Sequence, residues 1–175
     1  NTIGYKAQKT AFSQLLSSKM NNNAENPPLV GNGVRDVCTG INLSEAPVIA
    51  SQGSLDLAIS GNGWFGVKNN SQTEYTRNGN FSISLSGSSA SLVNQSGAYV
   101  LDSSGNQISS TVDSKTNSID INAMLKKVGV FTFSNPEALT PTSSNCYLAN
   151  DYTGKATADT KNNTVLKGYL EQSDV

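Results

Sequence analysis

The chain has 175 residues, a formal net charge of -1, and a composition that is 36% hydrophobic and 14% charged. A chain of this length holds one ordinary domain, or one domain and an extended arm, and its near neutrality offers no electrostatic basis for binding nucleic acid or an anionic membrane. The low hydrophobic fraction is typical of short strands, many turns and a thin core rather than of a large helical bundle.

The N-terminal part of the chain, residues 1–46, is predicted to form an extended arm and a linker. Tyr5 and Phe12 belong to a weak helical spacing, but the surrounding Ser and Thr residues weaken it, so we expect an extended or poorly ordered segment. Residues 20–28 contain three consecutive Asn residues and an Asn-Pro-Pro sequence, which mark a linker that no helix crosses. Residues 33–40 alternate partly and are predicted to be an edge strand with a bulge.

The middle of the chain, residues 47–146, is predicted to be a β-rich core domain. Short apolar runs separated by turn residues indicate strands at 48–50, 55–59, 64–68, 74–77, 81–85, 92–93 and 98–101. Such spacing points to an antiparallel sandwich or a barrel-like domain. Further strands are expected at 119–121 and 128–133, with a single helical turn between them at 122–127.

A short helix is predicted near the end of this core, because Asn135 can serve as its cap and Pro136 as its first residue. Residues 147–175 are predicted to form an extended C-terminal arm that packs with the N-terminal arm. The fold class that follows is mainly β: an elongated antiparallel β-domain with an irregular extended arm formed by the two chain ends.

Two segments, Leu55–Val67 and Tyr75–Phe81, carry the most specific local pattern of the chain. Each places an Asn-Gly pair between apolar and aromatic residues. Both central positions of a type I′ turn need positive φ, which Asn and Gly tolerate, so we predict a tight hairpin at each site. The first segment is not a dinucleotide fingerprint, because its next glycine lies in the wrong register and no helix follows.

Two kinds of side chain near these turns invite a functional interpretation. Arg77 can clamp a turn by donating to backbone carbonyls, or it can pair with Asp56 across strands. Trp64 and Phe65 are neighbours, so strand alternation sends one to each face of the sheet. We favour core positions and a protein–protein contact for these aromatic side chains over an exposed platform for carbohydrate.

The chain lacks the residues that most enzymes use. It contains no histidine, which excludes Ser-His-Asp and Cys-His arrangements and removes the commonest metal ligand. Its carboxylates are scattered and match no calcium-loop spacing. We therefore expect no enzyme activity, no cofactor and no metal ion. Cys38 and Cys146 are either two separate thiols or one long-range disulfide, and the sequence leaves both open.

The start of the chain does not resemble a secretory signal. No basic segment precedes an apolar core, residue 1 is not Met, and no hydrophobic run is long enough to span a bilayer. We expect a processed or trimmed piece, or a protein that is exported without a cleaved signal peptide.

Several segments, in chain order, resemble the bacterial flagellar hook and basal-body rod protein family. The start is similar to its Asn-Thr-x-Gly-aromatic-Lys motif, Phe133–Leu139 to its Phe-x-Asn-Pro-x-x-Leu element, and Gly168–Val175 to its Gly-x-Leu-Glu-x-Ser-Asn-Val segment, with Asp174 replacing Asn. The Gln-Gly turn and the two Asn-Gly segments match as well. The residues that carry the resemblance are Asn1, Thr2, Gly4, Tyr5, Lys6, Gln52, Gly53, Leu55, Asp56, Leu57, Gly61, Asn62, Gly63, Phe65, Tyr75, Thr76, Arg77, Asn78, Gly79, Phe81, Asn135, Pro136, Leu139, Gly168, Leu170 and Glu171.

This resemblance implies a structural subunit of the flagellar axial structure, which assembles helically with copies of itself, transmits torque and encloses the export channel. It implies terminal helices before residue 1 and after residue 175, neighbouring rod and hook proteins as partners, no nucleic-acid or small-molecule ligand, and a fragment that is monomeric by itself. The short polar stretch at 102–127 favours a rod protein, or a small hook-like homologue, over a hook protein with inserted outer domains. Among rod proteins the distal rod comes first and the proximal rod next. The alternatives are a hook protein or hook-like homologue, and a carbohydrate- or host-binding β-module that uses Trp64, Tyr75 and Tyr99.

Overall fold

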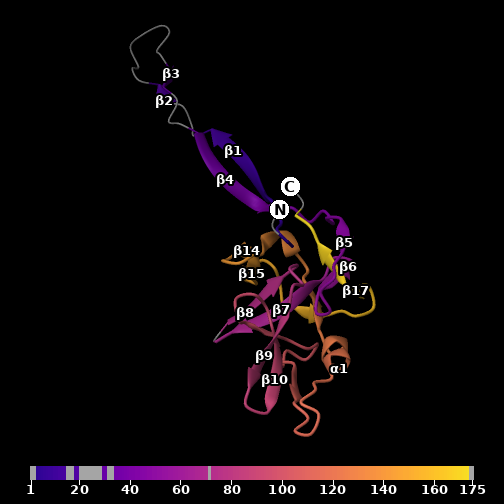
Figure 1. Ribbon diagram of the computed structural model, residues 1–175. Helices are drawn as coiled ribbons and strands as arrows, with labels where there is room; N and C mark the ends of the chain where they lie inside the picture. The colour runs from indigo at the N-terminus through magenta and orange to yellow at the C-terminus, as the bar shows by residue number, and fades with distance from the viewer. Residues whose placement is uncertain (1–2, 15–17, 20–28, 31–33, 71, 174–175) are drawn as a thin grey trace.

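The computed structural model describes residues 3–14, 18–19, 29–30, 34–70 and 72–173, and it describes side chains in 3–9, 40–70 and 72–173. A two-stranded ribbon projects from a β-rich body (Figure 1). The elements in chain order are β1 (Gln8–Gln14), β2 (Ser18–Lys19), β3 (Leu29–Val30), β4 (Val34–Ile41), β5 (Val48–Ala50), β6 (Leu57–Ser60), β7 (Trp64–Asn69), β8 (Gln72–Thr76), β9 (Ser82–Ser86), β10 (Ser89–Val93), β11 (Tyr99–Val100), β12 (Ser109–Thr111), α1 (Ile121–Lys126), β13 (Val130–Thr132), the 3-10 helix η1 (Pro136–Ala138), β14 (Thr140–Pro141), β15 (Cys146–Leu148), β16 (Thr157–Ala158), β17 (Thr164–Lys167) and β18 (Tyr169–Glu171).

The projecting ribbon consists of β1 and β4, which pair antiparallel. The strand predicted at 33–40 is thereby confirmed. Its partner β1 lies in the N-terminal segment, where we expected an extended chain in spite of a weak helical spacing. The bulge lies elsewhere than predicted: the register shifts between Lys9 and Thr10, opposite Gly40 and Cys38, and not beside the first residues of β4. The predicted linker at 20–28 lies outside the described residues.

The body is built on one large antiparallel sheet with strand order β12-β10-β11-β7-β8-β15-β14, in which β13 also pairs with β7 and β9 with β10. This confirms the mainly β, antiparallel fold class. Among the described strands the sheet stays open and does not close into a barrel. Three further strand pairs are separate two-stranded sheets: β17-β6 and β18-β5 in the body, and β1-β4 in the projecting ribbon.

The core divides into two clusters because β7 is buried on both faces. Phe65 belongs to the larger cluster and packs edge-on against Phe81, with 5.2 Å between ring centroids. Trp64 belongs to the second cluster and packs against Tyr147 at 5.1 Å. The predicted alternation of Trp64 and Phe65 across the sheet is confirmed, since both rings are buried on opposite faces of one strand.

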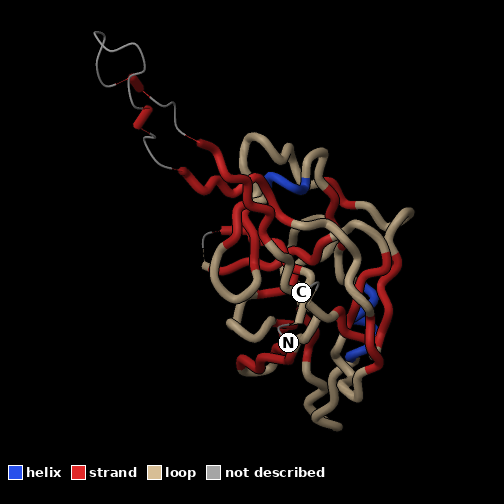
Figure 2. Tube along the Cα trace, turned by 90° about the horizontal axis from the view of Figure 1, so that it is seen from above, coloured by secondary structure: helices blue, strands red, loops and turns tan. Residues whose placement is uncertain are grey.

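The C-terminal residues add strands at several separate places in the body. β15 continues the large sheet, β16 pairs with β13, β17 with β6, and β18 with β5. The domain boundaries at 46/47 and 146/147 stay predictions, although β15 runs across the second of them. The two chain ends come together: Gly4 N donates to Glu171 O at 3.0 Å, and the end labels lie side by side in Figure 1 and in Figure 2.

The short helices follow the sequence closely. α1 matches the helical turn predicted at 122–127, because Asp120 Oδ1 accepts a hydrogen bond from Ala123 N at 3.0 Å and the helix buries Met124 and Leu125. η1 begins at Pro136 as predicted. Asn135, however, makes no side-chain cap bond and its side chain is exposed, so the predicted cap was wrong.

The two predicted Asn-Gly hairpins are wrong. β6 pairs with β17 and not with β7, and β8 pairs with β7 and β15 and not with β9. Each glycine segment is therefore a corner between strands that do not pair with each other: the first corner, residues 61–63, leads from the β17-β6 sheet to the large sheet, and the second corner, residues 77–79, joins β8 and β9 within the large sheet. Neither Asn62 nor Asn78 has positive φ, and of the glycines in the two corners only Gly61 does, at +119°.

Candidate functional site

The candidate site is the place where the two ends of the described chain meet the two corners. Gly4 adopts φ +64°, and a Cβ added there would lie 2.4 Å from Asn78 N. Only glycine lets the N-terminal segment lie so close to the second corner. Asn145 Nδ2 donates to Ile3 O at 3.2 Å, which holds the same segment from the other side.

A buried ionic cluster of Lys6, Arg77 and Glu171 lies at the centre of this junction. Lys6 Nζ is 2.8 Å from Glu171 Oε1, and Arg77 Nε is 2.6 Å from Glu171 Oε2. The exposed fractions are 3% for Lys6, 4% for Arg77 and 1% for Glu171. Lys6 Nζ also donates to Ser44 O, and Ala46 N donates to Glu171 Oε1 at 3.4 Å. One carboxylate thus joins the N-terminal segment, the second corner and the C-terminal strand.

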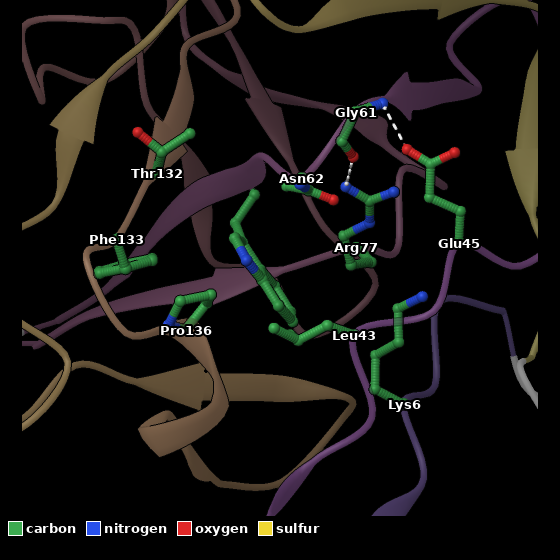
Figure 3. A pocket seen from close by; sticks show the side chains of 10 residues that line it. Lys6, Leu43, Glu45, Gly61, Asn62, Arg77, Thr132, Phe133 and Pro136 are labelled. Carbon is green, nitrogen blue, oxygen red and sulfur yellow. Dashed lines mark hydrogen bonds between the residues drawn. The ribbon is translucent and has the colours of Figure 1, made fainter.

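The guanidinium of Arg77 holds the first corner as well. Nη1 donates to Gly61 O at 2.7 Å and to Gly63 O, and Nη2 donates to Ile59 O at 3.1 Å (Figure 3). The predicted donation to backbone carbonyls is confirmed, but the carbonyls belong to the other corner. The predicted pair with Asp56 is wrong, because the carboxylate beside Arg77 is Glu171.

Gly63 and Gly79 are needed for close approach rather than for positive φ. A Cβ on Gly79 would lie 1.7 Å from Leu57 O, and one on Gly63 would lie 2.1 Å from Val130 Cγ1. Gly63 N donates to Asn163 Oδ1 at 2.7 Å. The two corners therefore bring chain segments together that any side chain would separate.

Asp56 organises the turn that precedes β6. Its carboxylate accepts hydrogen bonds from Ser51 Oγ and, at 2.8 Å, from Asn80 Nδ2. A Cβ on Gly53 would lie 2.2 Å from Asp56 Oδ2, and Gly168 N donates to Asp56 O at 2.8 Å. The resembling Gln-Gly and Leu-Asp-Leu segments thus contact the C-terminal motif directly.

The other residues that carry the resemblance divide by exposure. Asn1 and Thr2 lie outside the described residues. Tyr5, Gln52, Asn62 and Asn135 are exposed, and Leu55 and Pro136 are half-buried. The remaining members are buried in the core or at the junction: Leu57, Phe65, Tyr75, Thr76, Phe81, Leu139 and Leu170.

Sequence reasoning missed several polar residues that complete the junction. Asn163, 7% exposed, fixes Gly63, and Asn145 reaches the N-terminal segment. Both lie in polar loops with no local pattern to distinguish them from other Asn residues, so no signal in the sequence could have found them.

A cavity of about 290 Å³ adjoins the cluster (Figure 3). Its lining combines the two cations with Trp64, Phe133 and Pro136. The side-chain hydrogen bonds of Lys6 and Arg77 go to backbone carbonyls and to Glu171, so the two cations hold backbone in place. Within the described ranges, no group of three or more His, Cys, Asp or Glu side chains is placed to hold a metal ion.

The aromatic residues of the carbohydrate alternative do not form an exposed platform. Trp64 is 2% exposed and Tyr75 is 8% exposed, while Tyr99, which is 37% exposed, lies on β11 and not on β7 or β8.

Among the described side chains of the body, three groups have shifted pKa values besides the thiol described below. Burial raises the pKa of Tyr75. Among exposed carboxyls, backbone N–H donation from Lys115 lowers the pKa of Asp113, and the Asn162 side chain lowers that of Asp159.

Cys146 is a free, buried thiol on β15. Burial, with a smaller contribution from the charge of Glu74, raises its pKa from 9.0 to about 12. The unfolded chain loses this proton at lower pH than the folded chain, so stability falls as pH rises from about 9 to about 12. We expect the free energy of unfolding to drop between about pH 8 and about pH 10 by more in the wild type than in Cys146→Ala, as measured by urea denaturation. Equal drops in the two proteins would contradict the buried protonated thiol.

No helix among the described residues is long and apolar enough to cross a membrane. Residues 58–130 match the family model of the flagellar hook protein FlgE/F/G D1 domain. This match covers the first corner, the second corner and the strands up to the start of β13.

Two curated proteins are similar to the chain. The flagellar basal-body rod protein FlgG of Bacillus subtilis (strain 168) is 27% identical over 200 aligned positions, which cover 100% of this chain and 75% of that protein. The flagellar basal-body rod protein FlgF of Caulobacter vibrioides is 38% identical over 88 positions, which cover 50% of this chain and 34% of that protein. Together with the D1 match over residues 58–130, these relatives support the family of flagellar hook and basal-body rod proteins for this chain.

Proposed function

We propose that the chain is a structural subunit of the flagellar rod, and of the distal rod in particular. The observation that carries this is the buried junction of Lys6, Arg77 and Glu171, which fixes the N-terminal and C-terminal segments side by side. Gly4 and Glu171, one near each end of the described residues, are joined by a backbone hydrogen bond of 3.0 Å. A subunit that polymerises through paired terminal helices needs that arrangement.

The assignment to the distal rod rests on the relatives and on the insert length. FlgG of Bacillus subtilis aligns with the whole chain. The segment between β11 and α1 holds only β12 and turns, which leaves no room for an outer domain of the kind that hook proteins insert. A hook-like homologue is the second candidate, because the matched family model includes hook proteins.

The work of such a subunit is mechanical. Copies that meet through different surfaces in a head-to-tail manner do not close and so produce a helical filament. The rigid, hydrogen-bonded corners suit transmission of torque, and the filament encloses the export channel. We propose that the protein has no enzymatic role, that it reaches the basal body without a cleaved signal peptide, and that neighbouring rod and hook proteins are its partners.

Deletion of the gene in the source bacterium tests this function. We expect the deletion strain to lose swimming, and the purified basal bodies to lack the distal part of the rod in electron micrographs. Complementation with the wild-type gene restores both, and mass spectrometry then detects the chain in purified basal bodies. Normal swimming and complete basal bodies in the deletion strain would overturn the proposal, and basal bodies with a full rod but no hook would favour the hook-like candidate.

The chain of residues 1–175 is expected to sediment as a monomer at micromolar concentration, because only seven large hydrophobic side chains are exposed among the residues whose side chains are described. A tight dimer in analytical ultracentrifugation would contradict this, since stable interfaces bury roughly 1,200–2,000 Å².

A further inference from the structure

The hairpin of β9 and β10 lies at the end of the body opposite the β1–β4 ribbon (Figure 1). β10 pairs with β9 on one side and with β12 on the other, and among the described residues neither β9 nor β12 has a second partner along its length. The stretch 81–101 contains no charged residue and no proline. Proteins usually protect free strand edges with charges, prolines or bulges. These two edges lack such protection in their strands.

The ladder shows which backbone groups of β10 face which neighbour. Val112 N donates to Ser88 O at 2.9 Å, and Leu92 N donates to Ile108 O at 3.1 Å. Even-numbered residues along β10 therefore bond toward β12. Because hydrogen-bonded pairs alternate along an antiparallel ladder, odd-numbered residues bond toward β9.

The unpaired backbone groups follow from this alternation. On β9, Ile83 and Leu85 direct their N–H and C=O groups away from β10, and on β12 Ser109 and Thr111 do so. Each free edge thus offers two outward residues with the same spacing. β9 and β12 run in the same direction, since both are antiparallel to β10.

Side chains of the same kind also lie in register across β9, β10 and β12. Leu85 is 65% exposed beside the buried Ala90, and it is the most exposed aliphatic side chain of the body. On the opposite face, hydroxyl side chains form two cross-strand rows, which are Ser84–Ser91–Ser109 and Ser86–Ser89–Thr111.

We propose that β9 of one copy adds to the free edge of β12 of a second copy, so that the sheet β9-β10-β12 continues from subunit to subunit. The two edges are complementary because neither strand carries a charge that would have to be desolvated. The outward groups have equal spacing, the hydroxyl rows continue across the contact, and Leu85 becomes covered. The contact joins different surfaces of identical chains, so it repeats without closing. It rests on the proposed function as an axial subunit.

This contact is small, and its size predicts its strength. Two outward residues on each edge form a handful of hydrogen bonds and bury far less than the roughly 1,200 Å² of a stable interface. The free chain therefore associates with a dissociation constant on the order of 1 mM or weaker. Within an axial structure the copies are held together by other contacts, and the high effective concentration makes the edge contact form.

Nuclear magnetic resonance on the isolated chain tests the contact directly. As the concentration rises from about 0.05 mM to about 2 mM, we expect the amide signals of Ile83, Leu85, Ser109 and Thr111 to shift. The inward amides of Ser84 and Ser110 stay nearly constant and serve as internal controls. Unchanged signals at all four outward amides would overturn the proposal.

Two edge variants identify the partner strand. Leu85→Pro and Thr111→Pro each remove one outward N–H, and proline is tolerated on an edge where the N–H faces solvent. Each variant alone should lose the concentration-dependent shifts at both edges, whereas an equal mixture should recover them at the two intact edges. Leu85→Val and Thr111→Val keep the N–H and should behave like the wild type. Shifts that persist in Thr111→Pro alone would show that β9 pairs with β9, and would overturn the assignment to β12.

The test of the edge contact and the test of the rod assignment can fail independently of each other. If the deletion and complementation experiment succeeds and the outward amides do not shift, the edge contact is refuted while the rod assignment stands. If the amides shift as expected but the chain is absent from basal bodies, the rod assignment fails and the contact remains a property of the chain.

Discussion

Replacement of Glu171 by Gln should destabilise the protein by about 3–5 kcal/mol, as measured by urea denaturation. Glu171 is 1% exposed and is the carboxylate bonded to both Lys6 and Arg77. Gln keeps the shape and can still accept hydrogen bonds, but it removes the negative charge between two buried cations. Removal of one partner of a buried ion pair is costly because the remaining charge has neither water nor a counter-ion.

A surface ion pair provides the matched control. Lys9 and Glu137 are 3.1 Å apart with side chains that are 50% and 48% exposed. Exposed pairs contribute about 0–1 kcal/mol, so Glu137→Gln should change the free energy of unfolding by no more than that. Equal effects of the two Glu→Gln replacements would show that the junction does not depend on the charge of Glu171.

A second variant distinguishes the charge from the packing of the cluster. Lys6→Met leaves Arg77 and Glu171 as a neutral pair, so it should cost less than Glu171→Gln. In a double-mutant cycle, the loss caused by Lys6→Met should be smaller in the Glu171→Gln background than in the wild type, because one unpaired cation is removed along with its own interactions. Additive losses would mean that the two side chains do not interact.

The sequence could predict what depends on local periodicity. The opposite placement of Trp64 and Phe65 follows from the two-residue period of a strand. The helical turn predicted at 122–127 is present as α1, but the strand predicted at 119–121 is wrong, because Asp120 caps α1 and Ile121 is its first residue. The mainly β class follows from the same short apolar runs. These features need only neighbours in the chain, so they are visible without the fold.

The ionic junction could not be predicted in this way. Lys6 and Glu171 are 165 positions apart, and a charged residue in a polar segment usually lies in water. The family resemblance identified both residues as parts of motifs but assigned them no partner. Arg77 was expected to act on its own turn, yet neither corner is a hairpin and the first one lies beside the second, so the carbonyls within reach of Arg77 belong to residues 59–63.

The corner glycines show a different limit of local reasoning. An Asn-Gly pair is typical of a type I′ hairpin, and that pattern alone predicted positive φ at the corners. Gly79 has ordinary φ, and its lack of a side chain serves the approach of Leu57 from another sheet. The sequence therefore identified the position and the residue type correctly, and gave the wrong physical reason for them.

That difference leads to the second large expected effect: Gly79→Ala should destabilise the protein by about 3 kcal/mol or more, as measured by urea denaturation. The new Cβ would lie 1.7 Å from Leu57 O and 3.1 Å from Phe65 Cε2. The backbone of β6 must then move, and the hydrogen bond from Leu57 N to Gly79 O at 3.0 Å is lost or stretched. Since φ is ordinary, none of this cost comes from backbone strain.

Gly87→Ala is the control, because glycine is needed at position 87 for its backbone conformation and not for close approach. Gly87 closes the β9–β10 hairpin at φ +59°, and a Cβ there meets no atom within 4 Å. Its replacement should cost about 1–2 kcal/mol, the price of the left-handed conformation alone. Asn tolerates that conformation, so Gly87→Asn should be nearly neutral while Gly79→Asn should be as damaging as Gly79→Ala. A tolerated Asn at position 79 would support the hairpin explanation instead. It would also contradict the close contact between the second corner and β6, and the placement of Arg77 beside Glu171 depends on that contact.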